Sequence, residues 1–396
     1  MSPNEKIVNP ISSAELERRW AATRAVMDDR GLDVLVMQNS NEFLGGYVKW
    51  FTDTPARQAY PHSLMFPRND KMAVVRQGAM GGVQQVAEDD FANRGIGLLM
   101  TNPSYISVHY TRHYDADHII REIRKRGDLT VGLVGTATMS YDFCAHLQAE
   151  LPQVEFVDAT ELVDQLKAVK SPEEIERTRQ VATMQDEIVG ELLHYIKPGV
   201  RDFEIAAHAQ YLGQLKGSEQ GIFLGSSAPQ GKASVFVPRH FQGRALRAGD
   251  HLTLLVENNG AGGFYTEIAR TFVLGKASQE VLETFEQVRE AQQHTLQLLK
   301  PGASCKEIFL AHNAYMRSRN LPEESRLYAH SQGYDMVERP LIRDDETMKI
   351  EENMNIVVHP TIMRPSVFAT VCDNYIITRD GPSECLHKTP QKVFEL

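Results

Sequence analysis

The sequence carries the same three-residue punctuation twice, each time between two long stretches of helical periodicity. The first copy reads KPGVRDFEI from Lys197, and the second reads KPGASCKEI from Lys300. Pro and Gly end a helix, because Pro cannot continue it and Gly accepts the backbone conformation that closes it. An order of helix, KPG and helix that recurs after about 100 residues predicts a duplicated α+β half, with a cleft between the halves.

A domain boundary is predicted in the segment KAVKSPEEIE, residues 167–176. Ser171 is placed to cap a helix, a proline takes the first helical position, and Glu174 completes a capping box. A chain of 396 residues also exceeds one ordinary hydrophobic core. We therefore expect two domains, at residues 1–165 and 166–396.

The first domain alternates between strand-like and helical patterns, which is typical of an α/β fold. A helix is expected over residues 12–31, where Ser12 and Glu15 form a capping box. Strands are expected at LDVLVMQ, HSLMFP, KMAVVR, TVGLVG and VEFVDA, and a helix at GGVQQVAEDDFANRG. The aromatic segment 42–62 lacks periodicity, so we expect a surface loop or, alternatively, a loop that contacts a ligand.

Composition limits the partners of the chain. Forty-two Lys and Arg against 52 Asp and Glu give a formal charge of -10, which opposes binding to nucleic acid. The four cysteines are widely spaced and form no CxxC pair, so neither a disulfide framework nor a zinc ribbon is indicated. No signal peptide and no run of about 18 apolar residues is present. We expect a cytoplasmic protein with no nucleic-acid and no membrane partner.

The segment that carries chemistry reads as a β-hairpin. HLTLLVENN and FYTEIARTFVL are strand-like, and the glycine-rich residues 260–263 reverse the chain between them. Alternate side chains of such strands share one face. Glu257 and Glu267 are therefore expected to meet across the hairpin.

The stretch GDHLTLLVENNGAGGFYTEIARTF resembles the metal-site hairpin of the pita-bread superfamily, which includes methionine aminopeptidase, aminopeptidase P, prolidase, creatinase and ectoine hydrolase. AHSQGYDMVERP is similar to the His-bearing segment of that family, and MKIEENMNIVVHP and FATVCDNYIITRDGPSECL are similar to its two Glu-bearing strands. The resemblance implies an α+β fold, with a creatinase-like α/β domain at 1–165 and a pseudo-two-fold pita-bread catalytic domain at 166–396.

Metallopeptidases of this superfamily hold two divalent ions with two Asp, one His and two Glu. By resemblance, these five slots fall on Leu255 or Val256, Glu267, His330, His359 and Cys372. Only the His is unchanged, and the lost carboxylates argue against a dinuclear site of hard cations. We expect no metal cofactor. One zinc or iron ion, held among Glu257, Glu267, His330, His359 and Cys372, is the alternative.

The resemblance to the metal-free branches, creatinase and ectoine hydrolase, implies a metal-independent hydrolase of a C–N bond in a small polar or zwitterionic substrate. We expect Glu257 or Glu267 to act as base or nucleophile, and His330 and His359 to move protons and stabilise developing charge. Glu267 could instead be a buried ion pair with Arg270, and His359 and Cys372 could be inert fillings of the site.

Further candidates for substrate binding come from the comparison with creatinase. The slot of its catalytic His is Pro238, and His240 follows two residues later as a substrate-binding or a core residue. Arg339 and Arg57 match the two arginines that hold its substrate, the second from the neighbouring subunit. The active site then requires a homodimer, in which the N-terminal domain of one chain lies near the active site of the other. The candidate substrate-binding residues are Arg339, Arg57, His240, Phe51, Trp50 and Cys372.

Two other functions stay open. One is a mononuclear metal-dependent hydrolase or lyase, similar to the Xaa-Pro peptidases or to the dimethylsulfoniopropionate lyases of the superfamily. The other is a non-catalytic pita-bread module that binds proteins, as in chromatin-associated relatives. The acid–base residues of the hairpin argue against the binding module.

Overall fold

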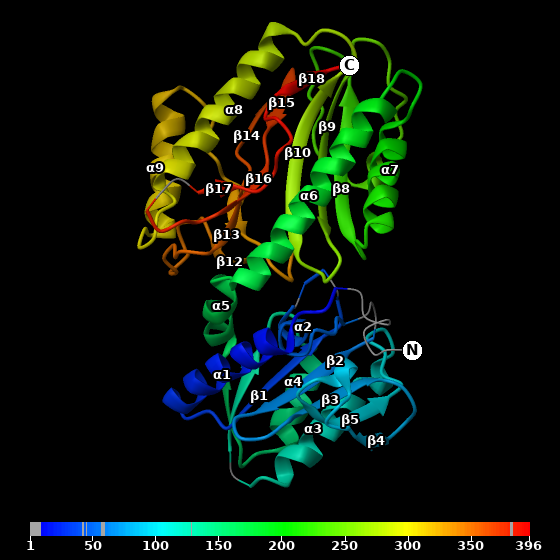
Figure 1. The fold of residues 1–396 in the computed structure, drawn as a ribbon, viewed down its shortest axis with the longest axis vertical. Helices are drawn as coiled ribbons and strands as arrows, with labels where there is room; N and C mark the ends of the chain where they lie inside the picture. The colour runs from blue at the N-terminus through cyan, green and yellow to red at the C-terminus, as the bar shows by residue number, and fades with distance from the viewer. Residues whose placement is uncertain (1–8, 42, 45, 57–59, 128, 381–382) are drawn as a thin grey trace. The chain divides into compact units, whose positions relative to one another are not determined.

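The structure is a computed structural model, and it describes residues 9–41, 43–44, 46–56, 60–127, 129–380 and 383–396 (Figure 1). The chain divides into two compact units, Met1–Lys167 and Ala168–Leu396. We call them the N-terminal unit and the C-terminal unit. Their boundary lies two residues beyond the expected one and falls inside the predicted boundary segment.

The N-terminal unit is built on a seven-stranded sheet of order β4-β5-β3-β2-β1-β6-β7. Strands β1, β3, β5, β6 and β7 run parallel, while β2 and β4 run antiparallel to them. The carboxyl ends of the five parallel strands therefore meet at one edge. The strands are β1 (Val34–Asn39), β2 (His62–Pro67), β3 (Met72–Gln77), β4 (Gly82–Gln85), β5 (Ile96–Asn102), β6 (Thr130–Val134) and β7 (Glu155–Asp158).

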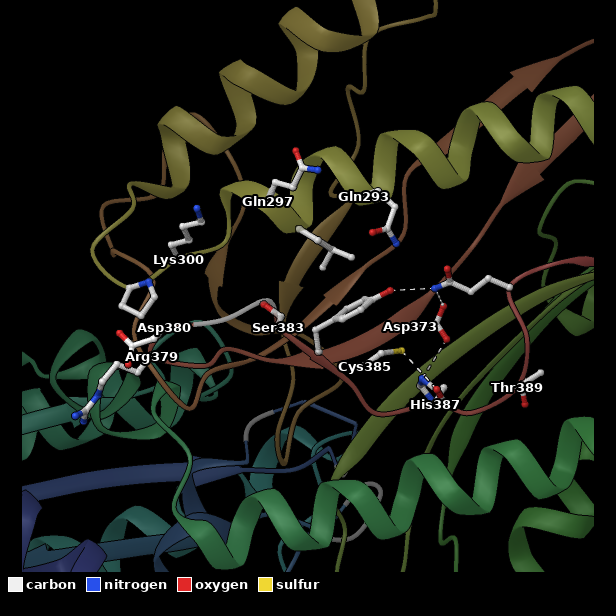
Figure 2. A pocket seen from close by; sticks show the side chains of 14 residues that line it. Gln293, Gln297, Lys300, Asp373, Arg379, Asp380, Ser383, Cys385, His387 and Thr389 are labelled. Atoms are coloured by element: carbon white, nitrogen blue, oxygen red, sulfur yellow. Dashed lines mark hydrogen bonds and ion pairs between the residues drawn. The ribbon is translucent and has the colours of Figure 1, made fainter.

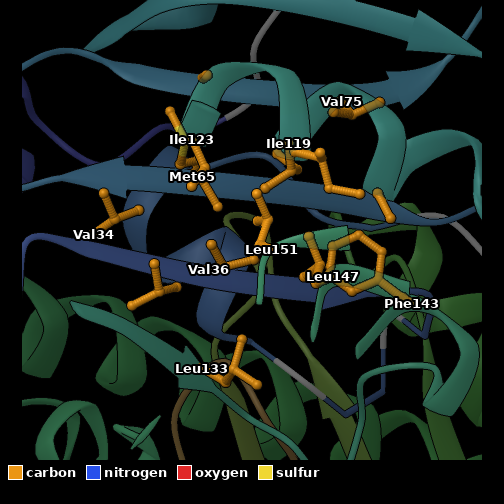
Figure 3. Packing of buried hydrophobic residues seen from close by; sticks show 14 of the residues in the cluster. Val34, Val36, Met65, Val75, Ile119, Ile123, Leu133, Phe143, Leu147 and Leu151 are labelled. Carbon is orange, nitrogen blue, oxygen red and sulfur yellow. The ribbon is translucent and has the colours of Figure 1, made fainter. Parts of the chain in front are cut away.

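One face of this sheet packs against α3 (Tyr114–Arg124) and α4 (Tyr141–Glu150). Figure 3 shows Val34 and Val36 of β1 among Ile119, Phe143 and Leu147 of the two helices. Residues at alternate positions of a strand share a face. The face of β1 that carries Val34 and Val36 therefore packs in the core against α3 and α4. The helices α1 (Ser13–Asp29) and α5 (Thr160–Ala168) complete the set of longer helices in this unit.

Five of the strands and the first helix confirm the sequence prediction, and two segments correct it. Residues 82–85, predicted as part of a helix, form β4, because their backbone pairs with β5 at the edge of the sheet and Val83 is exposed. Residues 47–52, predicted as loop, form the short helix α2 (Tyr47–Thr52). Six residues are too few to display a helical period, so the sequence pattern did not predict this helix.

The C-terminal unit contains the duplicated helix pairs that the KPG repeat predicts. The first pair is α6 (Pro172–Tyr195) and α7 (Asp202–Leu215), and the second is α8 (Gln279–Leu298) and α9 (Cys305–Ser318). Both KPG glycines are left-handed, with φ of 93° at Gly199 and 88° at Gly302. Their amides donate to Leu246 and Ile350, at 2.8 and 2.7 Å. The two turns are thus held by the same kind of backbone hydrogen bond.

The start of α6 also confirms a prediction. Ser171 and Glu174 form the predicted capping box of this helix.

Two sheets carry the site. The first has the order β18-β10-β9-β8, and the second has the order β12-β11-β13-β16-β17. A backbone bridge between Ala269 of β10 and Cys372 joins them just before β16. The strands are β8 (Gly221–Ala228), β9 (His251–Asn259), β10 (Tyr265–Val273), β11 (Ala329–Ser331), β12 (Glu338–Leu341), β13 (Asn355–Val358), β14 (Thr361–Arg364), β15 (Val367–Thr370), β16 (Asp373–Ile376), β17 (Glu384–Cys385) and β18 (Val393–Glu395).

Long helices α6 and α8 lie across the strands of this unit (Figure 1). Within the described part of the chain, no helix combines the length and the apolar character that crossing a membrane requires.

Candidate active site

The hairpin of β9 and β10 places two glutamates directly opposite each other. Glu257 pairs with Glu267 in the strand register, as predicted, and both side chains are buried. Gln332 donates from Nε2 to Oε1 of Glu257 at 2.8 Å, and the thiol of Cys372 donates to Oε1 of Glu267 at 2.9 Å. Two carboxylates that would repel each other if both were charged thus share one buried site.

Burial and mutual repulsion make this pair weakly acidic. Burial, followed by the charge of Glu267, raises the pKa of Glu257 well above its ordinary value. Burial also raises the pKa of Glu267, to about 7. A pair with raised pKa values holds a proton near neutral pH, so it offers one carboxylate and one carboxylic acid together.

His330 presents an unprotonated nitrogen to this pair. Its Nδ1 lies 3.0 Å from the carbonyl of Ser331, and a carbonyl only accepts, so the proton of the neutral ring is on Nδ1. Its Nε2 lies 3.9 Å from Oε2 of Glu267. Burial lowers the pKa of His330 to about 4. The imidazole is therefore neutral at pH 7.

His359 completes the cluster. Its ring centroid lies 5.3 Å from that of His330, with the rings near perpendicular. Among the residues that the structure describes, its buried Nε2 has no hydrogen-bond partner. Burial, and then the neighbouring His330, lowers the pKa of His359 well below its ordinary value. A buried ring nitrogen without a partner is costly unless a ligand, a water or an ion occupies the position in front of it.

Two of the three slots that lost a carboxylate lie in an apolar cluster. Strand alternation puts Leu255 on the face of Glu257 and Glu267, whereas Val256 faces the other way, so the structure assigns the first Asp slot to Leu255. Leu255 packs with Ala269, Val357 and Cys372, and the partly buried Leu224 and Phe236 border them. Burial raises the pKa of Cys372 well above that of an ordinary thiol, so Cys372 is a neutral donor rather than a nucleophile.

An amide network that the sequence analysis missed supports the glutamates. Asn374 donates from Nδ2 to the side-chain oxygens of Gln332 at 2.8 Å and Asn355 at 3.1 Å. Its own Oδ1 accepts from the backbone amide of Glu267 at 2.8 Å. The signal was present in the sequence, because Gln332 and Asn374 follow His330 and Cys372 by two residues, a spacing that shares one strand face.

A nearby arginine was also missed. Burial raises the pKa of Glu267, and the positive charge of Arg326 opposes part of that rise. Burial lowers the pKa of His359, and the charge of Arg326 lowers it further. Its Nη2 contacts Thr361 at 2.6 Å and Glu324 at 3.2 Å, and its side chain is 48% exposed. Arg326 follows no recognisable motif, because it lies in the irregular segment before β11.

Other expected site residues make contacts outside the cluster. Arg339 binds Glu346 through two nitrogens at 2.6 and 3.2 Å, so its bidentate face is already used within the chain. His240 is exposed on a 3₁₀ turn, where its ring meets that of Phe241 edge to face, rather than on a strand or in the core. The alternative interpretation, a buried ion pair of Glu267 with Arg270, is wrong, because residues three apart on a strand face opposite ways and Arg270 binds Asp373 at 2.7 Å.

The aromatic pair of the N-terminal unit is buried inside that unit. Trp50 is 2% exposed and Phe51 is 0% exposed, and their carbonyls accept from Arg19 at 2.9 Å and Trp20 at 2.8 Å. The expectation that they face a substrate is corrected, because these contacts bury α2 against α1. Arg57 lies outside the described residues.

The C-terminal unit also contains a cavity of about 880 Å³. Figure 2 shows it between Gln293, Gln297 and Lys300 on one side and Asp373 and His387 on the other. None of Glu257, Glu267, His330 and His359 lines it. In the acid–base cluster, Glu257, Glu267 and His330 are buried and His359 is half-buried.

The donor set fits one transition-metal ion and not two. Glu267, His330 and His359 each offer a ligand atom, and these atoms lie within 4.8 Å of one another. Two imidazoles and one carboxylate are a common set for a single zinc or iron ion. A second hard cation would not fit, because the slots of Leu255 and Cys372 hold no carboxylate to bind it.

Comparisons with known proteins agree with this architecture. The model of metallopeptidase family M24 matches residues 176–379, and that of the creatinase/prolidase N-terminal domain matches residues 19–169. Creatinase from Bacillus sp. (strain B-0618) is 25% identical over 381 residues, 91% of this chain and 86% of that protein. Ectoine hydrolase from Halomonas elongata is 24% identical over 411 residues, 97% of this chain and 98% of that protein.

The fold has a close counterpart among solved structures. The crystal structure of X-Pro aminopeptidase from Thermotoga maritima MSB8 superposes with a TM-score of 0.76 at 18% identity, covering 95% of this chain and 99% of that one. This confirms the expected α+β fold, a creatinase-like domain followed by a pita-bread domain.

Proposed function

The chain belongs to metallopeptidase family M24. Within this family, we propose that it is a metal-independent hydrolase of a C–N bond in a small polar or zwitterionic substrate. The observation that carries the proposal is the buried pair Glu257 and Glu267, opposed in the hairpin beside His330 and His359. Similarity to creatinase and ectoine hydrolase over most of the chain supports it.

The pair can supply both proton transfers of hydrolysis. One glutamate, as carboxylate, takes a proton from the water that attacks the carbon of the C–N bond. The other, as carboxylic acid, gives its proton to the departing nitrogen. One glutamate gains a proton while the other loses one, so the pair holds the same number of protons after the reaction as before it. The neutral His330 accepts or relays a hydrogen bond at Nε2, and Arg326 is the arginine best placed to attract a substrate carboxylate.

The test uses the purified full chain with creatine, ectoine and an Xaa-Pro dipeptide as probes, before and after dialysis against EDTA. We expect release of a hydrolysis product from at least one probe, at a rate that the chelator does not change. Glu267→Gln should lower this rate at least about 100-fold, while Glu88→Gln, an exposed residue of the N-terminal unit, should leave it unchanged. Loss of activity on dialysis with recovery on adding zinc or iron would overturn metal independence.

A mononuclear metalloenzyme, hydrolase or lyase, is the second candidate. The unpartnered Nε2 of His359, within 4.8 Å of ligand atoms of Glu267 and His330, favours it. A bound ion would polarise a substrate oxygen or activate a water. Elemental analysis should then find about one ion per chain, which His359→Ala loses and His240→Ala keeps. No stoichiometric ion in the purified protein would remove this candidate.

We also propose that the chain works as a cytoplasmic homodimer, in which Arg57 of one subunit serves the active site of the other. The resemblance to creatinase supports this arrangement.

A further inference from the structure

The N-terminal unit contains a cavity of about 290 Å³ at the edge where the parallel strands end. Residues that follow β1, β5 and β6, together with the first turns of α3 and α4, form its walls. The chain leaves β5 on one side of β1 and enters β6 on the other side. In open α/β sheets, ligands bind outside the carboxyl ends of the strands at such a change of side.

Most of the residues that line this cavity have polar side chains. A size close to 300 Å³ is at the lower end of the range for small-molecule sites. Short hydroxyl and amide side chains make up much of the lining, and they can donate or accept hydrogen bonds. They are Gln38, Ser40, Ser104, Ser107, Thr138 and Ser140.

Asp115 supplies a buried negative charge to this cavity. It is 2% exposed, and its carboxylate accepts from the hydroxyls of Ser104 and Ser63, the latter at 3.1 Å. Within the described ranges, Asp115 forms no ion pair with Lys, Arg or His. Burial raises the pKa of Asp115 to about 6. A buried carboxylate held only by neutral donors is costly, and a cationic group in the cavity would offset that cost.

Arg112 supplies a positive charge to the same cavity. Its Nη1 lies 3.3 Å from Asp142, and its side chain is 41% exposed. That contact uses one of the five N–H donors of the guanidinium, whose fork matches a carboxylate. His109 also lines the cavity. The site therefore offers a carboxylate in its buried part and, at its more exposed part, the guanidinium of Arg112 paired with Asp142, which also lines the cavity.

We propose that this cavity binds a small zwitterion, an α-amino acid or a close analogue, with its ammonium group on Asp115 and its carboxylate on Arg112. The site lies wholly in the N-terminal unit and uses no residue of the acid–base cluster of Glu257, Glu267, His330 and His359. It therefore goes beyond the proposed function and stands independently of it.

Equilibrium dialysis of the full chain against radiolabelled L-alanine tests the proposal. We expect saturable binding, which Asp115→Asn and Arg112→Gln each weaken by about tenfold or more, because a charge-assisted hydrogen bond is lost. Asp117→Asn is the matched control, since Asp117 lies on the same helix but binds His146 and does not line the cavity. Arg112 is partly exposed, so its variant should fold even if Asp115→Asn does not.

Two further measurements sharpen the result. Methylamine and acetate should each compete with L-alanine more weakly than glycine does, because each carries only one of the two charges. Glu267→Gln should bind L-alanine as the wild type does. The proposal is overturned if L-alanine does not bind saturably at concentrations on the order of 10 mM. It is also overturned if Arg112→Gln binds normally, or if Glu267→Gln abolishes binding, which would place the ligand at the catalytic cluster.

Discussion

At the scale of single residues, the site is built from groups that weaken the fold. Two glutamates opposed across a hairpin, the buried His330 and the half-buried His359 would each be better solvated in the unfolded chain. Gln332 and Cys372 offset part of this cost by donating to the carboxylates. Such groups persist in a folded protein where the chemistry requires them, because apolar residues of the same size would be more stable there.

Glu267→Gln should therefore stabilise the protein at alkaline pH. The raised pKa of Glu267, about 7 against an ordinary 4.5, means that the folded state holds a proton which the unfolded chain releases. Wild-type stability should fall as pH rises from about 4.5 to 7, and the neutral amide should not show this fall. We expect the melting temperature of the variant to exceed that of the wild type by about 3 °C or more at pH 8, with a smaller difference at pH 4.5. A difference that does not change with pH would contradict the raised pKa.

Gln332→Leu should move the pH dependence of activity. The Gln332 amide favours the charged form of Glu257, so its removal raises the pKa of Glu257 further. The pH profile of kcat should shift to higher pH, with a loss of about tenfold at pH 7 and little change in KM. The control is Gln279→Leu, at an exposed position of α8. A uniform loss at every pH would show that Gln332 matters for packing alone.

At the scale of elements, the two KPG turns are the firmest link between sequence and structure. In each, a long helix ends four residues before a left-handed glycine, and the glycine amide donates to a backbone carbonyl 47 or 48 residues later. The second helix of each pair then begins within a few residues. The same KPG sequence thus forms the same kind of turn at two places in the chain.

The equivalence of the two turns can be measured. A Cβ at Gly199 or Gly302 would meet no atom within 4 Å, so alanine there costs only backbone strain, about 1–2 kcal/mol in the left-handed region. Both variants should lower the free energy of unfolding in urea by similar amounts. Gly190→Ala is the control, because Gly190 is inside α6 and equally open, so alanine should stabilise by about 0.5–1 kcal/mol. Unequal losses at the two turns would show that they are not equivalent.

At the scale of the whole molecule, the two units hold different chemistry. The C-terminal unit contains the acid–base cluster, and the N-terminal unit contains the small charged cavity beside Asp115. Proposals that join the units or join two chains depend on assembly in solution, and mass measurement by light scattering should give about twice 44.6 kDa for a homodimer.

Mixed dimers test whether Arg57 acts across subunits. Arg57→Ala and Glu267→Gln should each inactivate the homodimer. If Arg57 serves the neighbouring chain, a mixed dimer regains one intact site, so random mixing should restore about a quarter of wild-type activity. Equal expression of the two chains is checked by mass spectrometry. Activity that stays at the level of the single variants would mean that Arg57 acts within its own chain or not at all.

How much was predictable differs between the fold and the site. Strand and helix patterns are local, so they predicted most elements, the domain boundary segment and the pairing of Glu257 with Glu267. They failed at α2 and β4, where six- and four-residue segments carry too little periodicity. The amide network of Gln332, Asn355 and Asn374 joins three segments far apart in the chain, and only the packed sheets bring it together.

By itself, the sequence determined the family, the duplicated catalytic domain and the loss of the acidic metal ligands, because each is written in residue type and spacing. Only the tertiary structure decided that Leu255 and Cys372 form an apolar wall, that Arg339 is occupied by Glu346, and that Glu267, His330 and His359 converge. The reason is physical. Spacing states which residues share a face, but burial and the partners that surround a side chain set its charge, and these come from contacts between distant segments.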